Sequence, residues 1–211
     1  YWDIIPSPLD SSYDVVDRGS NKKLKPKITN KDIPKKYPSG SELIVQVTKG
    51  PIGTKGPRVT TNVLLPGRFL VLLPNSEQSG VSRKIENKEE RSRLKKIVRE
   101  LNIPDGMGII IRTAGEGQRK AYFIRDLAML IESWNQITER VHNQKGGSCV
   151  FEEPDLIERT VRDVLTEDIE RIVVDNSTEA DRVKELIGRV SKRSIEKVHR
   201  YNYSEPIFDR F

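Results

Sequence analysis

Apolar residues recur at intervals of three and four in two long stretches, which is the spacing of a helix that buries one face. This pattern predicts a helix from about Lys88 to Leu101 and a second from about Arg119 to His142, separated by the breakers Pro104 and Gly106. We interpret both as helices that cover a sheet. The inward positions are Leu94, Ile97, Val98 and Leu101 in the first, and Ile124, Leu127, Ala128, Ile131, Trp134, Ile137 and Val141 in the second.

Short apolar runs between turn residues predict strands at residues 42–47, 62–65, 68–73 and 108–111. Pro66 and Gly67 form a turn signal between the second and third of these runs. Because these strands accompany the two long helices, we expect mixed α/β structure over residues 62–157.

In the C-terminal part of the chain, residues 158–211, the apolar pattern predicts a helix, a strand, a helix and a strand in that order. We expect a buried strand at residues 172–174, and Thr178 to Asp181 resemble a capping box at the start of the next helix. Strands alternating with helices of this length predict a βαβ unit. The apolar helix positions are Val161, Val164 and Leu165, then Val183, Leu186, Ile187 and Val190.

The composition is compatible with a nucleic-acid partner without demonstrating one. The chain has 211 residues, 35% of them hydrophobic, and a formal net charge of +6. Cys149 is the only cysteine, which excludes an intrachain disulfide and a cysteine metal cluster and fits a reducing compartment. No apolar run reaches the roughly 18 residues of a membrane span. Since the chain starts without methionine, we expect an interior part of a longer protein.

Seven lysines lie between residues 22 and 36 against one acid, Asp32. The run is typical of a solvated loop, and the alternative is a segment that meets phosphates with release of counterions. The sequence leaves both interpretations open. The lysines are Lys22, Lys23, Lys25, Lys27, Lys31, Lys35 and Lys36.

No catalytic centre can be built from these residues. The chain has neither a P-loop nor an HExxH motif, and His142 and His199 are isolated from any acid and nucleophile. Asp175 lies at the end of an expected buried strand, where a metal ligand can lie, but a helix cap or a turn residue is equally common there, and Asn176 and Ser177 beside it favour the turn.

One stretch, GIIIRTAGEG at residues 108–117, does predict an anion site. Arg112 offers a planar guanidinium that matches phosphate oxygens, and the Thr113 hydroxyl can donate to the same oxygens. Gly115 and Gly117 would let backbone N–H groups approach the anion closely.

Several motifs together resemble the ribonuclease E/G family. Their order and spacing match the family pattern across about residues 42–138, and two later segments, EEPDLIERTVRDVL and YNYSEPIFDRF, look like its continuation. The matching motifs are KGPRVTT at residues 55–61, LPGRFLVLLPN at residues 65–75, GVSRKI at residues 80–85 and GMGIIIRTAG at residues 106–115.

The resemblance implies a multi-domain α+β and α/β architecture. Residues 1–61 would be the C-terminal part of an S1 RNA-binding domain, an OB-like β-barrel. Residues 62–157 would be the mixed α/β 5′-sensor domain, and residues 158–211 the C-terminal part of an RNase H-like α/β domain. The DNase I-like catalytic domain would lie outside the chain, which should therefore contain no catalytic residue and be inactive by itself.

The resemblance also implies the activity and its partners. The parent would be a bacterial, cytoplasmic, homo-oligomeric endoribonuclease that cuts single-stranded RNA in RNA processing and decay. It would use Mg²⁺, and zinc in some members, through ligands outside this chain. A non-catalytic RNA-binding module that keeps the sensor fold is the alternative, and a ribosome-associated protein that uses only the basic loop is a third.

The family's site residues carry over onto six positions of this chain. Its pocket for a 5′-monophosphate maps to Gly67, Val71, Arg112 and Thr113, and contacts with the RNA backbone map to Lys49 and Lys55.

Overall fold

The computed structural model describes residues 12–19, 31–165, 169–190 and 192–210. They form two compact units, Tyr1–Phe151 and Glu152–Phe211. The three predicted domains, with their boundaries after residues 61 and 157, remain predictions. In chain order the elements of the first unit are β1 (Tyr13–Val15), α1 (Ile33–Lys36), β2 (Gln46–Lys49), β3 (Arg58–Thr60), β4 (Leu65–Pro66), β5 (Leu70–Leu73), β6 (Gly80–Ser82), α2 (Lys88–Glu100), β7 (Gly108–Ile111), a 3₁₀ turn (Thr113–Gly115) and α3 (Lys120–Asn143).

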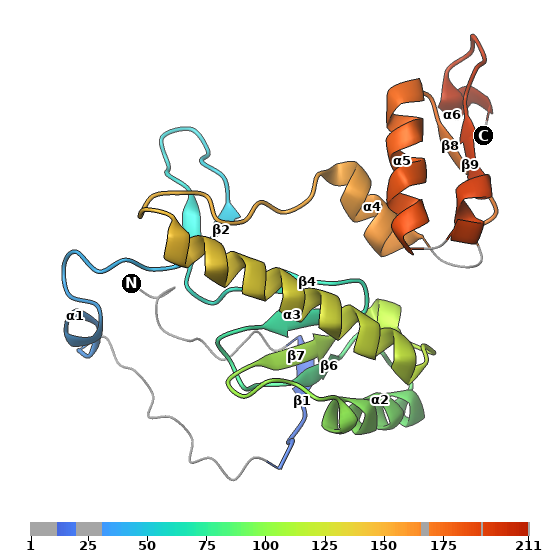
Figure 1. The fold of residues 1–211 in the computed structure, drawn as a ribbon. Coiled ribbons are helices and arrows are strands. Elements are labelled where there is room, and N and C mark those ends of the chain that lie inside the picture. Colours follow the sequence, from blue (N-terminus) through green and yellow to red (C-terminus); the bar gives the residue numbers. More distant parts are fainter. Residues whose placement is uncertain (1–11, 20–30, 166–168, 191, 211) are drawn as a thin grey trace. The chain divides into compact units, whose positions relative to one another are not determined.

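The first unit is built on a mixed five-stranded sheet in the order β1–β6–β7–β5–β4 (Figure 1). Strands β6 and β7 are parallel, and the other neighbouring pairs are antiparallel. The central pair buries four side chains completely, Leu70 opposite Ile111 and Leu72 opposite Ile109. Since side chains alternate along a strand, the half-buried Val71 lies on the opposite face.

Two amphipathic helices close the core of this unit, and α3 lies across the sheet in Figure 1. Helix α2 begins at Lys88 because the Asn87 side chain accepts hydrogen bonds from the N–H groups of Glu89 and Glu90 at 2.9 and 3.1 Å. None of the described helices is long and apolar enough to cross a lipid bilayer. The buried positions are Leu94, Ile97 and Val98 in α2, and Phe123, Leu127, Leu130, Trp134 and Ile137 in α3.

The two helices are confirmed to within a residue or two at their ends, but the inward face of α3 differs from the prediction. Ile124 was expected inside and is 51% exposed, whereas its neighbour Phe123 is fully buried. Apolar residues occupy both positions, so the periodicity alone could not distinguish the two faces. In the structure, the face of α3 that packs against the core is the one that contains Phe123, Leu127, Leu130, Trp134 and Ile137.

Residues 12–61 do not form a separate closed barrel where the structure describes them. Strand β1 joins the main sheet by pairing with β6, and β2 and β3 form an antiparallel hairpin of their own. The hairpin is tied to the chain before β4 through the Gln46 side chain, which donates to the Leu64 carbonyl at 3.0 Å and accepts from its N–H at 2.9 Å. The predicted strand at residues 42–47 forms only from Gln46 onward.

The second unit confirms the predicted βαβ arrangement, since β8 and β9 are parallel neighbours with a helix between them in sequence. The strand at residues 172–174 was expected to be buried, but its three residues are half-buried. Leu165, Val183, Ile187 and Val198 form its buried cluster. Its elements are α4 (Leu156–Val164), β8 (Ile172–Val174), α5 (Ser177–Val190), a 3₁₀ segment (Lys192–Lys197), β9 (Val198–Arg200) and α6 (Ile207–Arg210).

The predicted capping box at Thr178 is wrong. The cap of α5 is Asn176, whose side-chain oxygen accepts from the N–H groups of Thr178 and Glu179 at 3.0 and 3.2 Å. Asn is as good a cap as Ser or Thr and comes first along the chain, so Thr178 is already helical.

Candidate phosphate-binding site

Arg112 lies directly after β7 and is held there by two contacts with the turn between β4 and β5. Its backbone N–H donates to the Phe69 carbonyl at 2.8 Å, and its guanidinium Nη1 donates to the Gly67 carbonyl. The backbone of Arg112 is extended, and the residue is half-buried. A flexible cation at a strand end is thus anchored to a neighbouring turn.

That turn is itself organised by Asp126 of α3. The Asp126 carboxylate accepts from the backbone N–H groups of Arg68, Phe69 and Leu70 at 3.2, 2.8 and 2.8 Å. A β-carbon on Gly67 would lie 2.7 Å from the same carboxylate, so a larger residue would require the carboxylate to shift. Asp126 therefore positions the Gly67 carbonyl, and this carbonyl in turn orients Arg112.

Thr113 opens the 3₁₀ turn after Arg112 and is exposed, so its hydroxyl can reach a ligand. The two glycines of this turn do not have the predicted role. The N–H of Gly115 donates to the Arg112 carbonyl at 3.0 Å, and the N–H of Gly117 donates to the Glu90 carboxylate at 2.8 Å. The expected backbone concavity for an anion is therefore wrong at these two amides, and the candidate ligands are side chains.

The start of α2 clamps the same turn. Arg93 donates to both Glu90 oxygens at 2.7 and 2.6 Å and to the Gln118 carbonyl at 3.0 Å. The hydrogen bond from Arg93 and, to a smaller extent, the one from the Gly117 N–H lower the pKa of the Glu90 carboxyl, while partial burial opposes them. The carboxylate is therefore the form that holds the turn.

The structure brings Gly67, Val71, Arg112 and Thr113 together at the adjoining ends of β5 and β7. Arg112 follows the inward-facing Ile111, and strand alternation places its side chain on the same face as Val71. The arrangement combines a cation and an adjacent hydroxyl with an apolar side chain nearby. Such a set suits one phosphate attached to an organic group.

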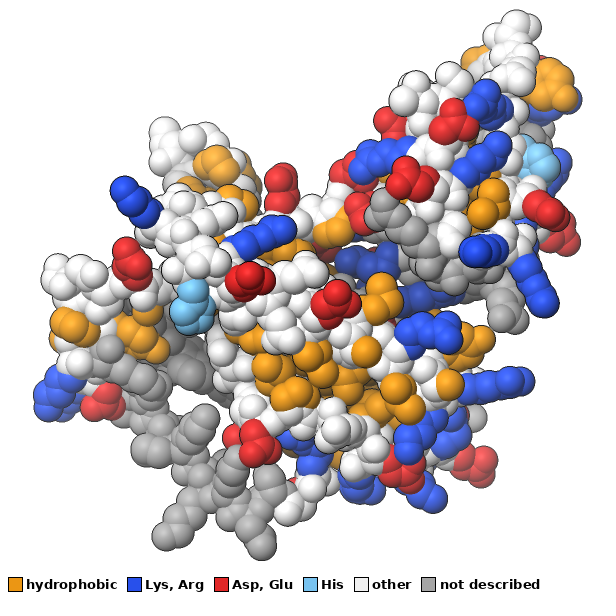
Figure 2. Space-filling view, in the orientation of Figure 1, with side chains coloured by type: hydrophobic (Ala, Val, Ile, Leu, Met, Phe, Trp, Pro, Cys, Tyr) orange, Lys and Arg blue, Asp and Glu red, His pale blue; other side chains and the backbone are white. Residues whose placement is uncertain are grey.

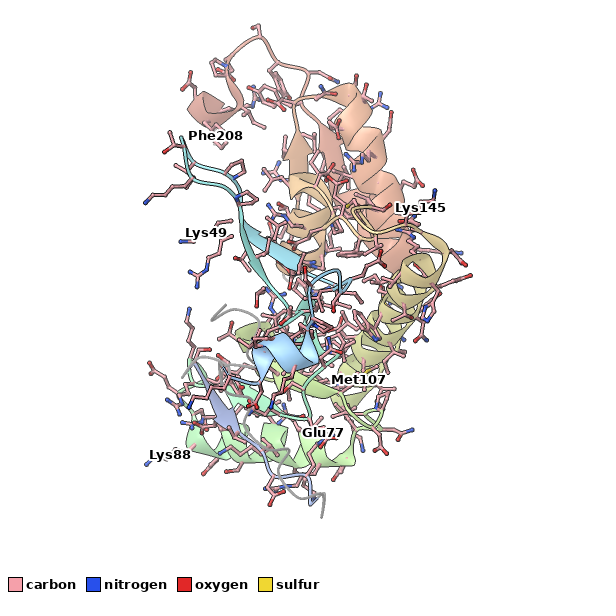
Figure 3. The ribbon with its side chains drawn as sticks, turned by 90° about the vertical axis from the view of Figure 1, so that its left-hand side faces the viewer. Lys49, Glu77, Lys88, Met107, Lys145 and Phe208 are labelled. Carbon is pink, nitrogen blue, oxygen red and sulfur yellow. The ribbon has the colours of Figure 1, made fainter. Side chains whose placement is uncertain are left out.

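Lys49 and Lys55 do not belong to this group. Both are exposed on the hairpin, Lys49 at the end of β2 and Lys55 in the connection to β3. Figure 3 shows the Lys49 side chain pointing outward from the hairpin. Their contact with an RNA backbone stays a prediction.

Comparison with known proteins agrees with the motifs. A model of the ribonuclease E/G family matches residues 64–211. The chain belongs to the ribonuclease E/G family. It is 38% identical over 183 residues to Ribonuclease G of Escherichia coli K12, which covers 87% of this chain and 37% of that protein.

Other members of the ribonuclease E/G family are similarly related. Ribonuclease E of Nostoc sp. is 39% identical over 146 residues, covering 69% of this chain and 21% of its own length. Ribonuclease G of Haemophilus influenzae is 36% identical over 199 residues, covering 94% of this chain and 40% of its own length. The chain thus spans no more than 40% of these ribonucleases.

Among the described residues, no group of three or more His, Cys, Asp or Glu side chains could hold a metal ion. His142 contacts the Thr138 carbonyl of its own helix at 2.6 Å, and His199 is exposed on β9.

Of the lysine-rich stretch, Lys22, Lys23, Lys25 and Lys27 lie outside the described residues.

Asp126 is the residue of the candidate site that the sequence analysis missed. A signal was available, because this acid lies between Phe123 and Leu127, two inward positions of a long amphipathic helix. A charged side chain beside a buried stripe usually has a partner. Its partners are backbone groups of the β4–β5 turn, and no sequence pattern identifies those.

Proposed function

We propose that this chain is the RNA-binding, 5′-monophosphate-sensing portion of a Mg²⁺-dependent endoribonuclease that cuts single-stranded RNA in RNA processing and decay. Membership in the ribonuclease E/G family supports the enzyme class. The observation that carries the sensing role is the guanidinium of Arg112, held by the Gly67 carbonyl next to the exposed Thr113.

In this proposal, the terminal phosphate binds through side chains. Arg112 supplies charge-assisted hydrogen bonds from a planar group that matches two phosphate oxygens. The Thr113 hydroxyl donates to a neighbouring oxygen, and Val71 packs against the terminal nucleotide above Gly67. Binding free energy is then added only when the 5′ end carries a phosphate.

The cleavage step is assigned to the parent protein and to none of the described residues. Mg²⁺ would supply a metal-activated water for attack on a phosphodiester, and its ligands are expected outside this chain. A bacterial cytoplasmic location and self-association of the full-length protein remain predictions of the family resemblance.

The sensing role is tested by the affinity of the full-length protein for one short single-stranded RNA with a 5′-monophosphate or a 5′-hydroxyl end, in EDTA to prevent cleavage. We expect tighter binding of the phosphorylated strand, and Arg112→Ala should lower its affinity by about tenfold, since hydrogen bonds to charged groups contribute about 1.5–3 kcal/mol. Binding of the 5′-hydroxyl strand should change little.

Arg125→Ala is the matched control, because it removes the same charge from an exposed position next to Asp126. It should retain the preference for the phosphorylated strand. Equal affinities of the wild-type protein for both strands, or an undiminished preference in Arg112→Ala, would remove the sensing role. Absence of cleavage by the full-length protein with Mg²⁺ would favour the non-catalytic RNA-binding module.

A further inference from the structure

The charges of α2 are sorted onto different sides of the helix. At about 100° per residue, Lys88, Arg91, Lys95 and Arg99 fall within an arc of about 80° that contains no acid. We call these four residues the basic strip. The acids of the helix, Glu89, Glu90 and Glu100, lie on the other side.

The basic strip lies against β1 and the residues that follow it, where it is only partly neutralised. Asp14 of β1 pairs with three cations, Lys95 at 3.2 Å, Arg83 at 3.1 Å and Arg91. The Arg99 Nε donates to the Asp17 backbone carbonyl at 3.2 Å, a contact that removes no charge. One carboxylate shared by three cations leaves a local excess of positive charge.

The strip remains accessible to a partner. Lys88 and Arg99 at its two ends are exposed, and the side chains of Arg91 and Lys95 keep 26% and 31% of their surface in contact with solvent. Figure 3 shows Lys88 at the beginning of α2 with its side chain pointing outward. Lys and Arg side chains also gather with a few acids around the region of α2 in Figure 2.

The length of the strip distinguishes an extended anion from a small one. From residue 88 to residue 99 the helix rises about 17 Å, at 1.5 Å per residue. One phosphate cannot contact cations spread over that distance, whereas a chain of phosphates can. Because the chain belongs to a ribonuclease family, the polyanion it meets is RNA.

We propose that the basic strip binds the phosphate backbone of an RNA strand and adds affinity that does not depend on the 5′ end. The choice of RNA as partner rests on the proposed function. The strip is separate from the candidate phosphate site, because the turn after β7 is held by Glu90 and Arg93, which lie on the other side of α2. The strip therefore acts on RNA strands with or without a 5′ phosphate.

The test compares the salt dependence of RNA binding by the full-length protein in EDTA, using a 5′-hydroxyl single strand. Lys88→Gln combined with Arg99→Gln removes the two exposed ends of the strip. The slope of log K against log salt should become shallower by about 1.4, at about 0.7 for each lost single-strand phosphate contact. The ratio of affinities for 5′-monophosphate and 5′-hydroxyl strands should stay at its wild-type value.

A matched control removes two charges elsewhere on the same surface. Lys96→Gln combined with Lys120→Gln takes away two cations that face Glu100 outside the strip, and the slope should change by much less. Lys88→Arg combined with Arg99→Lys keeps the charges and should keep the wild-type slope. Together these variants separate position from net charge and from loss of fold.

Three results would overturn the proposal: an unchanged slope in the strip variant, an equal change in the control, or lost binding to phosphatidylglycerol–phosphatidylcholine vesicles with unchanged RNA binding. The last would assign the strip to a membrane surface. A failure of 5′-end sensing is detected separately, because it appears as equal wild-type affinities for the two strands and leaves the slope measurement intact.

Discussion

The Asp126 carboxylate and the missing side chain of Gly67 occupy one space. Three backbone N–H groups hold the carboxylate, so moving it aside for a β-carbon at residue 67 would disrupt these hydrogen bonds. The two residues should therefore be energetically coupled although neither reacts with a substrate. Asp126 is a positioning residue, since it acts on the site through the β4–β5 turn.

Gly67→Ala should destabilise the first unit by about 1–3 kcal/mol through overpacking against that carboxylate. Asp126→Ala should cost a similar amount by leaving backbone donors without their acceptor. In the double variant the clash is gone, and the combined loss should fall short of the sum by about 0.5–3 kcal/mol. Urea unfolding followed by tryptophan fluorescence measures this, and strictly additive losses would refute the coupling.

The residues alone predicted part of the candidate site. A cation and a hydroxyl at a strand end indicated an anion site at Arg112 and Thr113, and the family resemblance added Gly67 and Val71. The Gly115 and Gly117 amides were misjudged because their acceptors include Glu90, which is 27 residues from Gly117 in the chain. Local sequence shows which donors exist, but only the tertiary structure shows which of them are already used.

At the scale of the elements, α2 controls the turn after β7. Because the pKa of Glu90 is lowered, its carboxylate contributes fully to stability at pH values above its ordinary pKa of 4.5. This contribution is lost as the pH falls through the pKa of the folded state. Glu90→Gln should therefore reduce stability by about 1 kcal/mol at pH 7, because a charge-assisted pair with Arg93 is lost.

The difference between wild type and Glu90→Gln should shrink as the pH falls below about 4, since protonation removes the same charge from the wild-type protein. Urea unfolding at pH 7 and at pH 3.5 measures both values. Glu89→Gln is the control, because Glu89 is exposed on the same helix turn. A loss for Glu90→Gln that does not depend on pH would contradict a charge-based clamp.

The elements differ in how far the sequence determines them. The helices at residues 88–100 and 120–143 were predictable because a long amphipathic period is a local property. Strand β1 was not, because three residues with one buried side chain carry no reliable pattern. It forms through pairing with β6, more than 60 residues later in the chain.

At the scale of the whole molecule, the described residues form two buried clusters that share no member. The candidate phosphate site and the basic strip both belong to the first unit, while the βαβ arrangement and its cluster belong to the second. A cavity in one cluster removes contacts from that cluster alone. Damage to the second unit is therefore expected to leave RNA 5′-end binding unaffected.

Ile187 and Leu72 allow a matched comparison, because each is completely buried, one in each cluster. Truncation to alanine should cost about 2–5 kcal/mol in either case. Hydrogen exchange of the full-length protein should show faster exchange in α5, β8 and β9 for Ile187→Ala, and in β5 and β7 for Leu72→Ala. Only Leu72→Ala should also weaken the preference for a 5′-monophosphate, because β5 carries Val71 and adjoins Arg112. If Ile187→Ala weakens that preference equally, the two units are coupled and the site depends on both.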